Sequence, residues 1–298
     1  LLADPVEFKV EEPISGAQPM LQESITVTYY VEIDPSVTET KMVYNYKGAE
    51  IEVEGESFGN GQWGFDLPEI LPQDMNENIA ATLYIGDQAV STKETYSMKQ
   101  YCMNQLEKTT DADAELRALL VALLNYGTES QKYFEGATEG FANADLTDLQ
   151  KAYLPVFNIA DAENVIETPL SGTADDSYKW KSATLGLFDK ISIRFKFQAT
   201  DISKLVLDIN GKSYSGDDFV SVGNNTYAVE FKGVMPESYD DTVTAKFMVD
   251  SVQVGQTVSY NVNTYLKNKM NAEAVKAIVQ AIYDYGCAAE AYSNRSPL

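Results

Sequence analysis

The segment "LLNYGTESQKYF", from Leu123 to Phe134, and the segment "AIYDYGCAAEAYS", from Ala281 to Ser293, decide how this chain is organised. Both carry apolar residues at helical spacing, and both place a glycine directly after a tyrosine within that pattern. Shifting the chain on itself by 159 positions superimposes Gly127 on Gly286 and brings the flanking residues into register. The sequence therefore predicts that one helix is present twice.

The correspondence continues upstream with slightly larger offsets. "SFGNGQW" from Ser57 falls on "SVGNNTY" from Ser221 at an offset of 164, and "ITVTYYVEI" from Ile25 falls on "ISIRFKFQA" from Ile191 at 166. Alternation of apolar and polar residues in these runs predicts half-buried strands. Short strands separated by turns rich in glycine and asparagine favour a small antiparallel β-sandwich in each copy.

Each copy then changes to helical spacing. Ser97 followed by Gln100 is a capping-box pattern for a first helix, and a second helix is expected to start at Asp111 or Asp113, or at Asn271 in the second copy. The predicted fold class is α+β, with two tandem related units that each consist of a sandwich and an antiparallel helical hairpin. The units are expected at 1–140 and 182–298, joined by a linker at 141–181 that contains a short helical pattern.

The repeated glycine needs a physical reason, because glycine inside a helix costs roughly 1 kcal/mol relative to alanine. A second element that approaches the helix closely would supply that reason. Tyrosines seven residues apart flank the glycine on one helix face, so we interpret the pattern as a helix-docking contact and keep a ligand groove as the alternative. The expected docking residues are Tyr126, Gly127, Tyr133, Tyr285, Gly286 and Tyr292.

"LNYGTESQKYF" followed by "FANADL", and preceded by "YSMKQYCMNQL" and a β-rich segment, resembles a repeat module of large secreted and cell-surface proteins of gut-dwelling Firmicutes such as Clostridia. The resemblance covers nearly the whole chain, although the second copy departs from it with "YGCAAEAYS". It implies an extracellular, multi-module bacterial surface protein of which this chain is a fragment. It implies no activity and no catalytic residues.

Charge and composition exclude several function classes. The 298 residues hold 45 acidic and 22 basic side chains, a net charge of −23, which repels nucleic acid and anionic membrane surfaces. The chain has no histidine, so it lacks the commonest general base and the usual ligand of zinc, copper and iron. It has two cysteines, Cys102 and Cys287, which we expect to be small core residues, with a single bridge as the alternative. No apolar run is long enough to insert into a membrane.

Carbohydrate binding on a sandwich requires exposed aromatic rings. Tyr30 aligns with Lys196 and is predicted to point outward, Trp63 follows a turn, and Trp180 ends the linker. These three residues are the candidate glycan platform, and packing at a sheet edge is the alternative for them.

Carboxylates suggest two further kinds of site. Asp111, Asp113 and Glu115 have a spacing that could surround calcium, but the run lacks the glycine and the distal glutamate of an EF-hand loop. Their alternative role is favourable charge at a helix N-terminus. A hydrolase that uses two carboxylates is the second alternative function, and it requires a shifted carboxylate in a cleft.

From the sequence we expect a non-catalytic extracellular module, a spacer or a protein-interaction and adhesion unit of a bacterial surface protein. A carbohydrate-binding module is the first alternative. The expected partner is a protein or a glycan, with calcium as the one cofactor left open.

Overall fold

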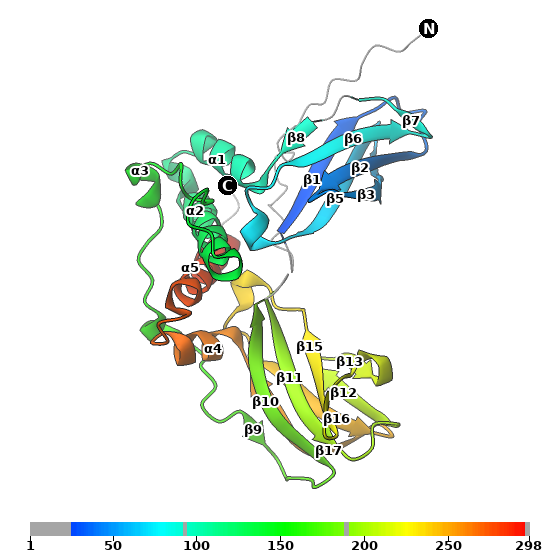
Figure 1. The fold of residues 1–298 in the computed structure, drawn as a ribbon, viewed down its shortest axis with the longest axis vertical. Helices are drawn as coiled ribbons and strands as arrows, with labels where there is room; N and C mark the ends of the chain where they lie inside the picture. Colours follow the sequence, from blue (N-terminus) through cyan, green and yellow to red (C-terminus); the bar gives the residue numbers. More distant parts are fainter. Residues whose placement is uncertain (1–24, 92–93, 188–190, 296–298) are drawn as a thin grey trace. The chain divides into compact units, whose positions relative to one another are not determined.

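The computed structural model describes residues 25–91, 94–187 and 191–295. Strands and helices are mixed and the sheets are antiparallel, so the α+β class predicted from the sequence is correct (Figure 1). The chain divides into two compact units, residues 1–154 and residues 155–298, which we call unit 1 and unit 2. The division falls within the segment 141–181 that the sequence suggested as a linker.

Unit 1 contains two antiparallel sheets. One has the strand order β1-β5-β4, and the other has the order β3-β2-β6-β7, with β8 also paired to β6. The strands are β1 (Ile25–Glu32), β2 (Thr40–Tyr46), β3 (Ala49–Glu54), β4 (Glu56–Gly59), β5 (Gln62–Ile70), β6 (Ile79–Ile85), β7 (Gln88–Ala89) and β8 (Glu94–Tyr96).

The inner faces of these sheets form the core of unit 1. Tyr44 on β2 is fully buried, its ring lies 5.8 Å from that of Tyr29 on β1, and its Oη donates to the main-chain oxygen of Phe65 on β5 at 2.8 Å. A buried hydroxyl must find such a partner, because an unpaired one costs about 1–3 kcal/mol. This hydrogen bond therefore joins the two sheets across an otherwise apolar core.

A short 3-10 helix, η1 (Pro72–Asp74), connects β5 to β6 and is anchored on both sides. Buried Asp74 accepts hydrogen bonds from Tyr46 Oη at 2.6 Å and from Lys47 Nζ at 2.8 Å. The next residue, Met75, accepts a main-chain hydrogen bond from Lys99 at 2.8 Å. Charge-assisted contacts of this kind are stronger than neutral ones, so the segment is held at a fixed position.

The helices of unit 1 follow the strands. Ser97 caps the first helix by accepting from the main-chain nitrogen of Gln100, as the capping pattern predicts, and Asp113 is the N-cap residue of the long second helix. The helical segments of unit 1 are α1 (Met98–Lys108), the 3-10 helix η2 (Asp111–Asp113), α2 (Ala114–Ser130), the π-helical turn η3 (Gln131–Glu135) and α3 (Asp148–Lys151).

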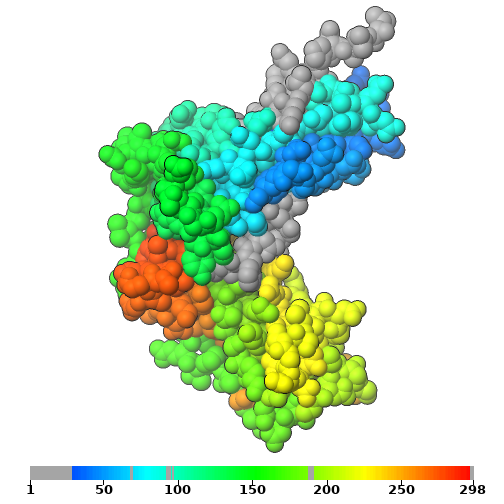
Figure 2. Space-filling model, viewed as in Figure 1, coloured from blue at the N-terminus to red at the C-terminus, as the bar shows by residue number. Residues whose placement is uncertain are grey.

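Unit 2 also contains two sheets, ordered β10-β11-β15-β14 and β13-β12-β16-β17-β9. Figure 2 shows the chain as a space-filling model, in which the residues of unit 2 run in colour from green through yellow to red. The strands are β9 (Leu170–Ser171), β10 (Tyr178–Leu187), β11 (Ile191–Ala199), β12 (Leu205–Ile209), β13 (Lys212–Ser215), β14 (Val220–Gly223), β15 (Thr226–Phe231), β16 (Val243–Val249) and β17 (Val252–Tyr260).

The helical segments of unit 2 lie before, between and after these strands. Helix α4 begins after Asn261, whereas α5 begins at Lys276, five residues later than the start predicted at Asn271. The helical segments of unit 2 are η4 (Ile159–Asp161), η5 (Gly216–Asp218), η6 (Pro236–Ser238), α4 (Val262–Lys269) and α5 (Lys276–Ser293).

The two helix glycines lie against 3-10 segments, as the docking interpretation requires. A Cβ atom added to Gly127 in α2 would lie 2.4 Å from Met75 Sδ, directly after η1. One added to Gly286 in α5 would lie 2.4 Å from Cδ2 and 3.0 Å from Cε2 of Tyr239, directly after η6. A normal carbon contact is about 3.5–4.0 Å, so only glycine fits at either position without displacement.

Three of the four flanking tyrosines are core residues, and one is not. Tyr126, Tyr285 and Tyr292 are buried, whereas Tyr133 is 46% exposed. The expectation for Tyr133 is wrong because α2 ends at Ser130 and the chain continues as the π-helical turn η3, which changes the helical spacing. Tyr133 instead packs edge-on against the ring of Phe134.

We predict that Gly286→Ala lowers the free energy of unfolding of unit 2 by about 1–3 kcal/mol, because the overpacking against the Tyr239 ring exceeds the gain of about 1 kcal/mol in helix propensity. Calorimetric unfolding measures the change. Ala291→Gly, at an exposed position of the same helix, is the matched control and should cost about 1 kcal/mol. An equal or higher stability of Gly286→Ala would contradict the close approach.

Candidate functional site

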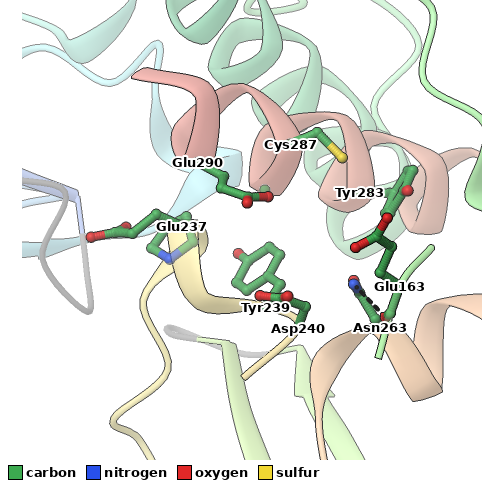
Figure 3. Close-up of a pocket in the computed structure, with 10 residues that line it drawn as sticks. Glu163, Glu237, Tyr239, Asp240, Asn263, Tyr283, Cys287 and Glu290 are labelled. Carbon is green, nitrogen blue, oxygen red and sulfur yellow. Dashed lines mark hydrogen bonds between the residues drawn. The ribbon is translucent and has the colours of Figure 1, made fainter. Parts of the chain in front are cut away.

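A pocket of about 260 Å³ lies within unit 2, where α5 faces η6 and the start of α4 (Figure 3). Tyr283, Gly286 and Cys287 line it from α5, and Tyr239 lines it from the segment after η6. Carboxylates enter from several parts of the unit. The acidic lining residues are Glu163, Glu237, Asp240 and Glu290.

A buried asparagine positions the acidic segments around this pocket. Asn261 caps α4 by accepting from the main-chain nitrogen of Thr264 at 2.8 Å. Its Nδ2 donates to the main-chain oxygens of Asn164 at 2.7 Å and Asp240 at 2.8 Å. Ile166 closes the network by donating its main-chain N–H to Thr264 Oγ1 at 2.9 Å. All polar atoms of the Asn261 amide are thus used to hold the chain before β9 against the chain after η6.

Two side chains beside Asn261 extend this network. Asn164 Nδ2 donates to Asp240 Oδ2 at 2.8 Å, and Asn263 Nδ2 donates to the main-chain oxygen of Glu163 at 3.3 Å, the contact drawn in Figure 3. These asparagines carry no motif that marks them as site residues in the sequence. The available signal was the position of Asn261 directly before a helical pattern, which is typical of an N-cap residue.

The pocket has a negative electrostatic character. Partial burial raises the pKa of the Glu290 carboxyl, and the negative charges of Asp240 and Glu163 raise it further. Figure 3 shows that the Glu237 carboxylate points away from the other labelled side chains. The pocket would therefore attract cations and repel anions.

The thiol at this pocket is poorly suited to nucleophilic chemistry. Burial raises the pKa of Cys287 to about 11, so the group is a neutral thiol near pH 7. Burial, followed by the neighbouring Cys287, also raises the pKa of Tyr283. Both cysteines of the chain are free, and burial raises the pKa of Cys102 to about 12.

The three acids proposed for calcium lie at the start of α2 in unit 1. Asp111 pairs with Arg117 at 2.7 Å, Asp113 Oδ2 accepts from both Thr110 N and Thr110 Oγ1, and Glu115 is in the first helical turn. These contacts fit the alternative role of charge and capping at a helix N-terminus. Over the ranges that the structure describes, no group of three or more aspartate, glutamate or cysteine side chains could hold a metal ion.

Two of the three aromatic platform candidates are engaged in packing. Trp63 is only 8% exposed and lies opposite Val31 in the ladder between β1 and β5. The ring of Trp180 stacks on Phe247 at 4.1 Å, and its Nε1 donates to the main-chain oxygen of Gln256 at 2.7 Å. The expectation of an exposed ring is therefore wrong for Trp63, and Trp180 belongs to an aromatic cluster with Phe195, Phe197 and Phe247.

Tyr30 does lie on the outer face of a sheet, as its alignment with a lysine predicted. It stands opposite Gly64 in the ladder between β1 and β5, and its ring centroid is 6.1 Å from that of Phe58 on β4. Phe58 is 55% exposed. We call Tyr30 and Phe58 the aromatic patch. Phe58 was not predicted as a site residue because it adjoins a glycine-rich turn. The available signal was its position two residues after Glu56, since alternate residues of a strand share one side and Glu56 is exposed.

No protein-family model matches this chain, and no curated protein matches it. The helices of the described ranges are all too short or too polar to cross a membrane.

We predict a carboxyl group on α5 that titrates near neutral pH. Burial raises the pKa of Asp284 to about 6, against about 3.9 for an unperturbed aspartate, and the hydrogen bond from Gln280 partly opposes the shift. Because the folded state binds this proton more tightly than the unfolded state, unit 2 should become more stable as the pH falls from 7 towards 4.

Carbon-detected NMR titration of the carboxyl groups measures this pKa directly. Asp284→Asn should stabilise unit 2 at pH 7 and should lose the advantage near pH 4, whereas Asp217→Asn, at an exposed turn, controls for the loss of one charge. A measured pKa near 4 would contradict the assignment.

Proposed function

We propose that this chain is a non-catalytic binding module of a secreted or cell-surface bacterial protein, and that it contacts its partners through the outer faces of its sheets. The observation that carries the proposal is the exposure of large apolar side chains on the terminal strands β4 and β14. Phe58 on β4 is 55% exposed, and Val220 and Val222 on β14 are 58% and 46% exposed.

Exposed apolar side chains on a terminal strand are unusual, because such strands can pair with other chains and are normally protected by charge. On β14, Val220 also borders a hollow of about 350 Å³. Ala228 and Tyr214 contribute to the same hollow, and an Arg194–Glu230 ion pair at 3.9 Å lies at its wall. An apolar surface bordered by polar groups is typical of an interaction site.

A duplicated architecture fits a module of a larger surface protein. The strand order β1-β5-β4 of unit 1 has its counterpart in β11-β15-β14 of unit 2, and β3-β2-β6 has its counterpart in β13-β12-β16. A glycine of the long helix packs on the residue after a 3-10 helix in each unit. These parallels support the proposal that the two units descend from one ancestral unit, in line with the offsets in the sequence.

A carboxylate hydrolase is favoured by one observation, the raised pKa of Glu290 in the pocket of unit 2. However, Glu290 is solvent-exposed, and the adjacent thiol is neutral near pH 7. The pKa of a catalytic carboxyl group is tuned by burial and neighbouring groups, and an exposed carboxyl group receives little of the burial effect. The electrostatic character of the pocket therefore supports cation attraction more strongly than catalysis.

The binding proposal predicts saturable binding of the fluorescently labelled chain to intact epithelial cells or to one of a panel of immobilised extracellular matrix proteins. The triple variant Phe58→Ser, Val220→Ser, Val222→Ser should bind at least about tenfold more weakly with an unchanged melting temperature, because it removes only exposed apolar surface. Equilibrium binding and thermal unfolding are the two measurements.

A matched triple variant at exposed polar positions, Ser57→Ala, Ser221→Ala and Ser213→Ala, should bind as the unaltered chain does. Equal binding by both triple variants, or no saturable binding at all, would overturn the proposal. Release of reducing sugars from polysaccharides, lost in Glu290→Gln, would instead support the hydrolase.

A further inference from the structure

We infer that the aromatic patch of unit 1, Tyr30 and Phe58, is a binding surface for a neutral carbohydrate whose pyranose rings lie against the two aromatic rings. This inference rests on the proposed function and deepens it by naming the ligand class of one sheet face. Aromatic ring faces carry partial negative charge and attract polarised C–H groups, which a pyranose presents on its apolar face.

The backbone beneath the patch is shaped to seat the rings. A Cβ atom added to Gly64 would lie 2.7 Å from Phe58 Cε2 and 3.4 Å from Tyr30 Cε1. Any larger residue at this position would therefore displace the Phe58 ring. Glycine in a strand interior is unfavourable by itself, and close approach of a ring or ligand is a recognised reason for it.

Two carboxylates lie on the same sheet face as the rings. Asp66 follows Gly64 by two residues on the same face of β5, and Glu56 lies opposite Gly64 on β4. Partial burial raises the pKa of the Tyr30 hydroxyl, and the negative charges of Asp66 and Glu56 raise it further. Carboxylates accept hydrogen bonds from sugar hydroxyls but repel uronate and sulfate groups, so the patch favours neutral glycans over anionic ones.

The geometry of β4 argues against an added peptide strand as the occupant. Its pairing with β5 is interrupted by a register shift between Ser57 and Gly59, and Gly59 has a φ of +85°. A bulge bends an edge strand and disrupts the row of main-chain groups that strand addition needs. The partly exposed rings of Tyr30 and Phe58 remain as the feature that a ligand can use.

Unit 2 provides an internal comparison. In its ladder between β11 and β15, Lys196 stands opposite Ala228 where unit 1 has Tyr30 opposite Gly64. On its terminal strand Val220 pairs with Ala228, as Glu56 pairs with Gly64 in unit 1. At the positions that match Tyr30 and Gly64, unit 2 has a lysine and an alanine, so sugar binding should be confined to unit 1.

The test is an array of neutral, amino, uronic and sulfated polysaccharides probed with the full chain, followed by calorimetric titration of the glycans bound. We expect binding to at least one neutral glycan, weakened about tenfold or more in Tyr30→Ala and in Phe58→Ala, and unchanged in Val252→Ala, which removes an exposed apolar side chain of β17. Gly64→Val should weaken binding as well, because its side chain displaces Phe58. Melting temperatures establish that each variant is folded, and Phe58→Tyr, which keeps an aromatic face, should retain binding.

An empty array, binding to anionic glycans only, or equal binding by Phe58→Ala and the unaltered chain would overturn the inference. Saturable binding to a protein that is lost in the triple variant, together with an empty array, would remove the carbohydrate assignment and leave the proposed binding module intact. These outcomes therefore distinguish a failure of the carbohydrate inference from a failure of the binding-module proposal.

Discussion

The close contact between a helix glycine and the residue after a 3-10 helix is the constraint on which each unit depends. In unit 1 the backbone of Gly127 approaches Met75, and in unit 2 that of Gly286 approaches the ring of Tyr239. In each unit the long helix packs on the 3-10 segment that connects two of the strands. Dense packing at this contact fixes the position of the helix relative to the sheets. Glycine has a low helix propensity, but a residue with a Cβ atom could not approach Met75 or Tyr239 this closely.

Polar contacts hold the 3-10 segments that receive these helices, and each unit uses different residues for this purpose. Unit 1 buries the carboxylate of Asp74 with Tyr46 and Lys47 as its partners. Unit 2 uses the amide of Asn261, which binds the main chain of Asp240 and of the segment before β9. The Asp74 carboxylate and the Asn261 amide each have hydrogen-bond partners for all their polar atoms, which is a condition for a buried polar group to stabilise rather than destabilise a core. The pocket of unit 2 follows from the second arrangement, because it brings Glu163, Asp240 and α5 together.

Aromatic residues occur both in the cores and on the surface of the two units. Several large rings, Trp180 and Tyr44 among them, pack between the sheets, and the polar atoms of these two donate to main-chain oxygens there. Tyr30 and Phe58 remain outside, on a three-stranded sheet with an irregular end strand. These two rings contribute little to the core, and they are the residues on which the carbohydrate proposal rests.

Local sequence patterns by themselves determined the fold class, strands such as β1 and β11, the Ser97 cap and the close approach at both helix glycines, but not β9 or the start of β10, which lie in the segment predicted as a linker. Alternation and turn chemistry act over a few residues, and a glycine inside a helix has few explanations. Tertiary structure decided that Trp63 is buried, that Tyr133 turns outward beyond the end of α2, and that Phe58 meets Tyr30 across Gly64. These outcomes depend on sheet pairing and on the exact end of a helix, which join residues far apart in the chain and leave no periodic signal in either segment.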